Sequence, residues 1–203
     1  MEALARWAGY LAIVGGAIAV VVIAITAYDP NSGSWYGFFL VVALLGAALP
    51  GLRVRTKVAT GQLGRASAWL SAIGALALLI AFGYAAAASQ ATSGSADPAS
   101  DPLAPVWLVS AVAWFIGNIG FAVALLRARV LSSIGAWLVL AGAVVGLVVS
   151  AVLGENLPPA VMLLFGLFGI GWIVIGYAAV RPTARAGMQG QELSRPGTGP
   201  GVA

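Results

Sequence analysis

The hydrophobic pattern of this chain consists of long apolar stretches separated by short polar segments. A helix needs about 20 mostly apolar residues to cross the hydrocarbon core of a bilayer. Six stretches have about this length, and none contains Asp, Glu, Lys or Arg. They cover residues 7–28, 34–52, 66–89, 103–126, 130–153 and 158–180. The pattern predicts an all-α integral membrane protein, with six transmembrane helices in a bundle over residues 1–181 and a disordered cytoplasmic tail over residues 182–203.

The composition excludes the other broad classes. Apolar residues make up 61% of the chain and charged residues 8%, whereas a soluble domain is about half apolar and about a quarter charged. The chain therefore has too few polar residues to cover the surface of a soluble fold. Intrinsic disorder is excluded as well, because disordered chains have low hydrophobicity.

The distribution of charge predicts the topology. With six spans, every basic residue falls on one side, and the connections on the other side contain Asp29, Asp97, Asp101 and Glu155. The positive-inside rule then places both termini in the cytoplasm. The preference for Arg over Lys suits a high-GC bacterium, so we expect a multi-pass protein of the cell (inner) membrane. The basic residues are Arg6, Arg53, Arg55, Lys57, Arg65, Arg127, Arg129, Arg181, Arg185 and Arg195.

This topology also explains the net charge of +4, so no nucleic-acid partner is expected. The most basic predicted connection is Arg53–Arg65, with Arg53, Arg55, Lys57 and Arg65. Basic segments beside a membrane attract anionic lipid headgroups. We expect these four side chains to contact headgroups, and docking of a cytoplasmic partner is the alternative.

Two short patterns recur along the chain. Residues 68–75 and 136–143 both have the sequence AWLxxxGA, and residues 46–55 and 120–129 both have the sequence GxxxxxLRxR. Repeats of this kind predict three tandem helical hairpins, formed by spans 1–2, 3–4 and 5–6. The alternative is chance similarity in a chain dominated by Ala, Gly, Leu and Val.

Small residues in the fifth span predict a packing face. Gly142, Gly146, Ser150 and Gly154 follow one another at four-residue spacing, which places them on one side of a helix. Small residues let helices approach closely in lipid. This column forms either an internal contact of the bundle or a seam for a second copy or a partner protein.

The residues available for chemistry are few. The chain has no Cys and no His, which excludes disulfides, Cys/His zinc sites and a Ser-His-Asp triad within it. Ionisable residues inside spans usually carry the function of a membrane protein, and the six spans have none. We therefore expect no catalytic residue, no metal and no cofactor, and the chain is not predicted to be an enzyme.

Asn118 is the most polar side chain well inside a span, and Trp114 lies one turn before it. An amide buried without a partner costs several kcal/mol. Asn118 therefore either forms a hydrogen bond between helices or contacts a ligand or pore. In the second case Asn118 and Trp114 are the candidate pocket residues.

Two functions fit these features. The first is an accessory or structural subunit of a membrane complex that acts through helix faces, with a membrane-protein partner or as a homo-oligomer. The second is a small transporter or substrate-binding membrane component for an apolar or neutral solute. The six-span layout and the size resemble those of the substrate-capture subunits of energy-coupling-factor vitamin transporters, without a shared motif.

Overall fold

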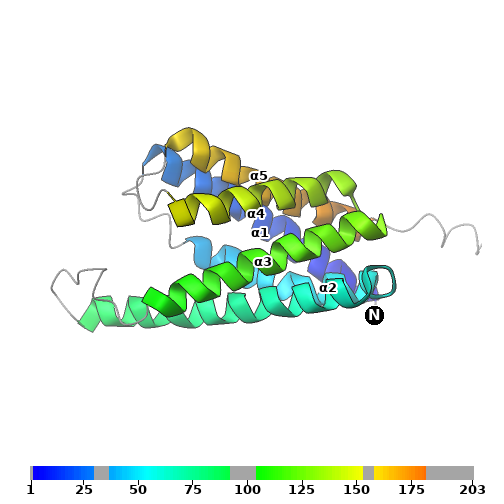
Figure 1. The fold of residues 1–203 in the computed structure, drawn as a ribbon, viewed down its shortest axis with the longest axis horizontal. Helices are drawn as coiled ribbons and strands as arrows, with labels where there is room; N and C mark the ends of the chain where they lie inside the picture. Colours follow the sequence, from blue (N-terminus) through cyan, green and yellow to red (C-terminus); the bar gives the residue numbers. More distant parts are fainter. Residues whose placement is uncertain (1, 30–36, 92–103, 153–157, 182–203) are drawn as a thin grey trace, which may run out of the picture.

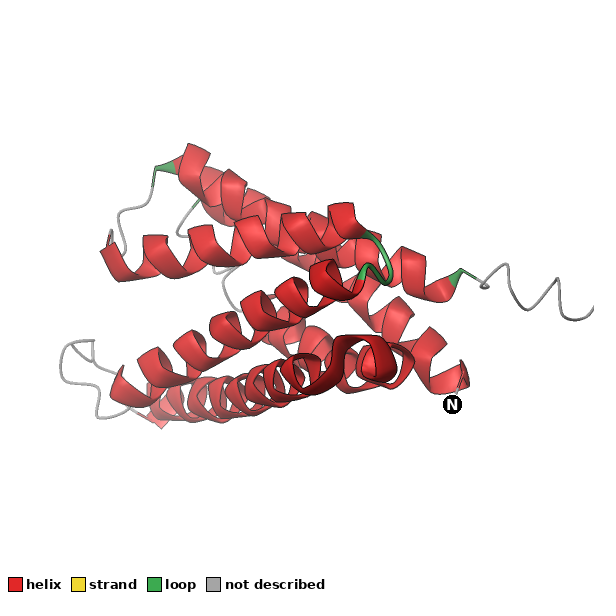
Figure 2. Cartoon of the chain, turned by 45° about the vertical axis from the view of Figure 1, so that its right-hand side comes forward, coloured by secondary structure: helices red, strands yellow, loops and turns green. Residues whose placement is uncertain are grey.

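The computed structural model describes residues 2–29, 37–91, 104–152 and 158–181, which are almost entirely helical (Figure 2). The helices are α1 (Glu2–Tyr28), α2 (Gly37–Ala91), α3 (Ala104–Ala128), α4 (Ser133–Val152) and α5 (Pro159–Val180). All of these except α4 are long and apolar enough to cross a membrane. The predicted all-α class is thus confirmed for the described residues, and four of the helices have the length and composition of candidate membrane spans. The predicted tail, residues 182–203, lies outside the described residues.

Six separate helices are not confirmed, because α2 covers both the second and the third predicted span. The predicted connection Arg53–Arg65 does contain a reversal of the chain, but it is not a loop between two separate helices, since this stretch is helical except at Gly61. The helix also continues through Pro50. Thr56 and Thr60 donate their hydroxyl groups to the carbonyl oxygens four residues earlier, at 3.2 and 3.0 Å, and so keep their polar groups satisfied within the helix.

Gly61 divides α2 into two limbs, residues 37–60 and residues 62–91. Its φ of 58° and ψ of −144° are not helical, and this region of backbone space is essentially restricted to glycine. The chain reverses direction there (Figure 1). The limbs then pack on each other, with the rings of Phe39 and Phe82 centred 3.9 Å apart. A Cβ at Gly46 would lie 2.9 Å from that of Ala75. The single element α2 is therefore a helical hairpin.

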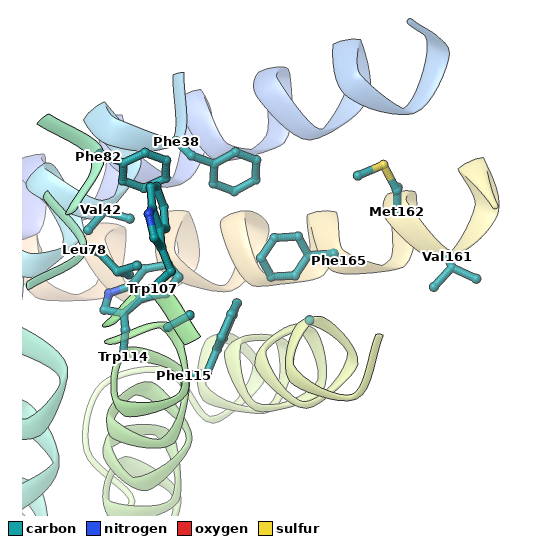
Figure 3. Close-up of a pocket in the computed structure, with 12 residues that line it drawn as sticks. Phe38, Val42, Leu78, Phe82, Trp107, Trp114, Phe115, Val161, Met162 and Phe165 are labelled. Atoms are coloured by element: carbon teal, nitrogen blue, oxygen red, sulfur yellow. The ribbon is translucent and has the colours of Figure 1, made fainter. Parts of the chain in front are cut away.

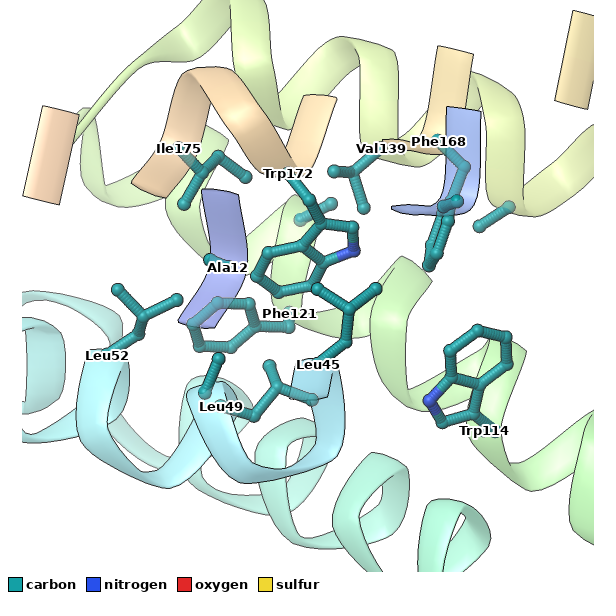
Figure 4. Close-up of a cluster of buried hydrophobic side chains, with 14 of the residues drawn as sticks. Ala12, Leu45, Leu49, Leu52, Trp114, Phe121, Val139, Phe168, Trp172 and Ile175 are labelled. Carbon is teal, nitrogen blue, oxygen red and sulfur yellow. The ribbon is translucent and has the colours of Figure 1, made fainter. Parts of the chain in front are cut away.

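The helices form a closed ring in chain order. α1 packs on α2, α2 on α3, α3 on α4 and α4 on α5, and α5 returns to α1. Within α2, the first limb contacts α1 through Leu45 and Gly15, and the second limb contacts α3 through Gly74 and Trp114. The ring encloses a core centred on Trp172, whose indole lies among Phe121, Leu45 and Val139 (Figure 4).

Two glycine pairs join α1 to α5. A Cβ at Gly16 would lie 2.5 Å from the carbonyl oxygen of Gly169, and one at Gly169 would lie 2.6 Å from that of Gly16. In the same way, a Cβ at Gly9 would lie 3.0 Å from the carbonyl oxygen of Gly176, and one at Gly176 would lie 2.5 Å from that of Gly9. Real Cβ atoms do not approach backbone this closely, so only glycine allows the two helices to lie at this distance.

The two copies of AWLxxxGA make corresponding contacts. In the hairpin of the second α2 limb and α3, Gly74 lies against the backbone of Trp114, and Gly117 lies against that of Ser71. In the hairpin of α4 and α5, Gly142 and Gly171 lie against the backbone of Phe168 and Val139, respectively. Ser71 and Val139 occupy the same position of the motif, as do Gly74 and Gly142. On the partner helices, Trp114 and Phe168 each lie three residues before the packing glycine. These two hairpins therefore share their packing, and a threefold repeat stays a prediction.

The basic residues gather at one end of the bundle. The start of α1, the reversal of α2, the turn between α3 and α4 and the end of α5 lie together there (Figure 1). All the basic residues of the described chain lie in or beside these segments. Arg55 joins two of the segments, because its guanidinium donates to the carbonyl oxygens of Ala179 and, at 3.1 Å, Arg181. It thereby satisfies carbonyl groups that the end of α5 leaves without helical partners.

Candidate functional site

A cavity of about 280 Å³ lies in the half of the bundle away from the basic end, and Figure 3 shows the residues of its wall. Its wall comes from both limbs of α2 and from α3, α4 and α5. Six of the wall residues are aromatic: Phe38, Phe82, Trp107, Trp114, Phe115 and Phe165. The others are Val42, Leu78, Ala111, Gly146, Val161 and Met162. Among these described wall residues none is charged, so the cavity is an apolar, aromatic site.

Contacts between rings hold the wall together across the helices. Phe82 and Trp107 meet edge to face with centroids 4.1 Å apart, which joins α2 to α3. Phe165 of α5 stacks on Phe38 at 6.1 Å and meets Phe115 at 5.8 Å. Such arrangements are favoured beyond the burial of their area alone. Figure 3 shows Phe38, Phe115 and Phe165 arranged around a common space from three different helices.

Gly146 gives Phe165 the room to reach this position. A Cβ at Gly146 would lie 2.7 Å from the ring of Phe165 and 3.1 Å from that of Phe115. Gly142, one turn earlier, lies against the backbone of Phe168. These two members of the predicted seam therefore face the interior of the bundle. Ser150 is in the last turn of α4, and Gly154 lies outside the described residues.

Trp114 connects the cavity with the core of the bundle. Its side chain is 3% exposed, and its ring contacts those of Phe115 and Phe168 at 5.0 and 5.4 Å. The close approach of its backbone to Gly74 fixes α3 against α2. Its indole nitrogen Nε1 is buried and has no hydrogen-bond partner. The structure thus places a buried, unused donor on a residue of the cavity wall.

Asn118 lies one turn further along α3 and is not a wall residue. It is fully buried and donates through Nδ2 to Ser71 Oγ at 2.9 Å and to the carbonyl oxygen of Trp114 at 2.8 Å. The first of these bonds joins α3 to α2, where Gly117 and Gly120 already allow close approach. Its Oδ1 has no partner. Asn118 therefore acts between helices beside the cavity, while Trp114 forms part of the wall.

The four predicted headgroup contacts have different surroundings. Lys57 and Arg65 are exposed beside the reversal of α2. Arg55 is half-buried and bonded to the end of α5. Arg53 is half-buried, and its Nε is buried without a partner. Lys57 and Arg65 are thus the members most accessible to a lipid headgroup or a partner.

Of the six aromatic wall residues, the sequence pattern indicated only Trp114 as a pocket residue. Phe82 and Trp107 lie near the ends of two consecutive predicted spans on the same side of the membrane, and that shared level was the available signal. Phe165 gives no such signal, because it lies among apolar neighbours that look alike in sequence.

Comparison of the chain with protein-family models, with curated proteins and with solved structures gives no match. Within the described residues, no group of three or more His, Cys, Asp or Glu side chains is arranged to hold a metal ion.

Proposed function

We propose that this protein is a multi-pass membrane protein that binds a small, neutral, apolar molecule in its aromatic cavity, as a substrate-binding or transport component. The cavity carries the proposal. Its volume of about 280 Å³ is just below the usual range for ligand sites, about 300–1,000 Å³, and therefore suits a small ligand. The wall offers rings for stacking and no charge to compensate a charged ligand, so a compact neutral ring system fits best.

The proposed setting has six membrane crossings, with both limbs of α2 spanning and both termini in the cytoplasm of a bacterial cell membrane. The reversal at Gly61 and the collection of basic residues at one end of the bundle support this topology. The cavity then lies in the half of the bilayer away from the cytoplasm.

Ligand-dependent stability tests this proposal. Purified protein in detergent is heated with and without fluorene, a rigid apolar ring system. Binding raises the midpoint of unfolding, because a ligand that binds only the folded state stabilises it. Ala111→Phe fills the cavity from its wall and abolishes the rise. Ala141→Phe adds the same ring at an exposed position of α4, and in this variant the ligand still raises the midpoint. An unchanged midpoint in the unmodified protein contradicts the proposal.

A second function, that of an accessory subunit, is favoured by the surface around the reversal of α2. Val58 is 91% exposed there, beside the exposed Lys57. Leu63 is 40% exposed just past the reversal. A hydrophobic side chain this exposed at the basic end suits a contact with a partner protein at the membrane surface. We propose this surface, Lys57, Val58 and Leu63, as the site of such a contact.

Purification from native membranes tests the second function. The unmodified protein retains a partner polypeptide at fixed stoichiometry, and Val58→Ser releases it. Val148→Ser makes the same change at a 53% exposed position of α4 and leaves the partner bound. A preparation that contains this chain alone contradicts the accessory role.

A further inference from the structure

The exposure of the cavity wall changes along the axis of the bundle. At the outer end, the end opposite the basic residues, the wall residues Phe38, Trp107 and Met162 lie near the starts of α2, α3 and α5 and are half-buried. Val42, one turn deeper on α2, and Phe115, two turns deeper on α3, are buried. The wall therefore closes toward the basic end and is accessible at the outer end.

The aromatic core lies between the cavity and the basic end. The ring of Trp114 contacts that of Phe168 at 5.4 Å, and Phe168 meets Trp172 at 6.3 Å. Trp172 stacks on Phe121 with centroids 6.3 Å apart, and both side chains are fully buried (Figure 4). A ligand therefore enters and leaves the cavity at its outer end.

Exposed aromatic residues indicate where the outer membrane surface lies. Trp and Tyr concentrate at the two surfaces of a bilayer. On α1, Trp7 and Tyr28 are 68% and 83% exposed, and the helix between them is about 30 Å long, the thickness of the hydrocarbon core. Tyr84 is 56% exposed and lies two residues beyond Phe82, whose ring meets that of Trp107 at 4.1 Å. The opening of the cavity is thus close to the level of the headgroups.

We propose that the ligand is an amphiphile, provided that the cavity binds a ligand as proposed above. Its compact ring system packs among Phe38, Phe115 and Phe165, and a neutral polar chain extends through the opening to the outer membrane surface. In this orientation the chain keeps its contact with water. The reverse orientation places the chain against the buried apolar wall, where polar atoms without partners are costly.

Derivatives of fluorene test this orientation, because its ring system is elongated and has two distinct ends. One derivative carries an ethylene glycol chain at one end, and another carries such a chain at both ends. Dissociation constants are measured in one detergent and corrected for partition into its micelles. We expect the one-chain derivative to bind within about threefold of fluorene, and the two-chain derivative to bind at least about tenfold more weakly, because its second chain meets the closed part of the cavity.

A second measurement locates the chain of the bound ligand. The protein has no cysteine, so one introduced thiol is labelled specifically with the fluorophore bimane. Tyr84→Cys places the label at the outer end of the second α2 limb, and Trp69→Cys places it about 20 Å nearer the basic end on the same limb, at a similar exposure of 54%. The one-chain derivative carries a nitroxide quencher at the tip of its chain. We expect quenching that excess fluorene abolishes in Tyr84→Cys and not in Trp69→Cys.

Three results overturn this orientation and leave the proposed function standing. They are a one-chain derivative that binds much more weakly than fluorene, a two-chain derivative that binds as tightly as fluorene, and fluorene-sensitive quenching that is no stronger in Tyr84→Cys than in Trp69→Cys. Failure of fluorene and of both derivatives to bind overturns the proposed function as well.

Discussion

At the scale of single residues, glycine determines how closely the helices pack. Hydrophobic association contributes little between helices in lipid, so close contact of backbones takes its place. Gly16 and Gly169 show this most directly, because each lies against the carbonyl oxygen of the other. Gly83 differs from both, since nothing lies within 4 Å of a Cβ built there. The same residue type therefore has different roles along the chain.

Substitution by alanine separates these roles. We expect Gly16→Ala to lower the free energy of unfolding by about 1–3 kcal/mol, the usual cost of overpacking. Gly83→Ala is the matched control and is expected to be neutral or stabilising by up to about 1 kcal/mol, because alanine favours a helix over glycine. Reversible unfolding in detergent measures both. A Gly16→Ala protein as stable as its control would mean that α1 and α5 do not pack at this distance.

A polar or aromatic residue within an apolar span could be recognised from the sequence. Whether an apolar residue faces the interior of the bundle or its outer surface could not. Asn118 and Trp114 stand out among apolar neighbours, and both turned out to be buried. Phe165 lies in the cavity wall while the preceding Leu164 is 51% exposed. Since lipid and core are both apolar, the sequence pattern does not distinguish the two surroundings.

At the scale of helices, the sequence predicts the apolar spans well and their connections less well. The predicted span 158–180 and the helix Pro159–Val180 nearly coincide. The stretch Arg53–Arg65 is polar, which indicates that the chain leaves the hydrocarbon region, but polarity does not end a helix. Only Gly61 departs from helical geometry there. The reversal of α2 is therefore a property of one glycine.

Gly61→Ala tests that dependence. Nothing lies within 4 Å of a Cβ at Gly61, so the cost comes from the backbone conformation alone. We expect a loss of about 1–3 kcal/mol in the free energy of unfolding, the range for residues held in sparsely populated regions. Gly83→Ala again serves as the control, because it has equal space but lies in regular helix. If both variants unfold alike, the chain does not need glycine at the reversal.

At the scale of the whole molecule, the ring of helices separates two chemically different ends. The end with the α2 reversal carries the basic side chains, and the opposite half holds the aromatic cavity. The start of α1 and the end of α5 both lie at the basic end, so a bundle that spans the bilayer crosses it an even number of times, as it does if both limbs of α2 span. The five helices of the described residues would then make six crossings, because α2 contributes two.

Reporter fusions at Ala96 and Ala203 distinguish the two topologies. Six crossings place the Ala203 reporter in the cytoplasm and the Ala96 reporter outside. If α2 crosses only once, both positions change sides, with Ala96 inside and Ala203 outside. A paired reporter set, one enzyme active in the cytoplasm and one active outside, reads each position twice. The second result would exclude the six-span arrangement.

The contact between α1 and α5 has a consequence for biosynthesis. Every other large contact in the ring joins neighbours in the chain, so it forms as soon as the next segment leaves the ribosome. The first and last helices meet only after translation has passed α5. Until then the glycine face of α1, with Gly9 and Gly16, has no helix of its own chain to pack on. We expect a nascent chain stalled before α5 to pair through this face with another copy, and release of α5 to dissolve that pairing.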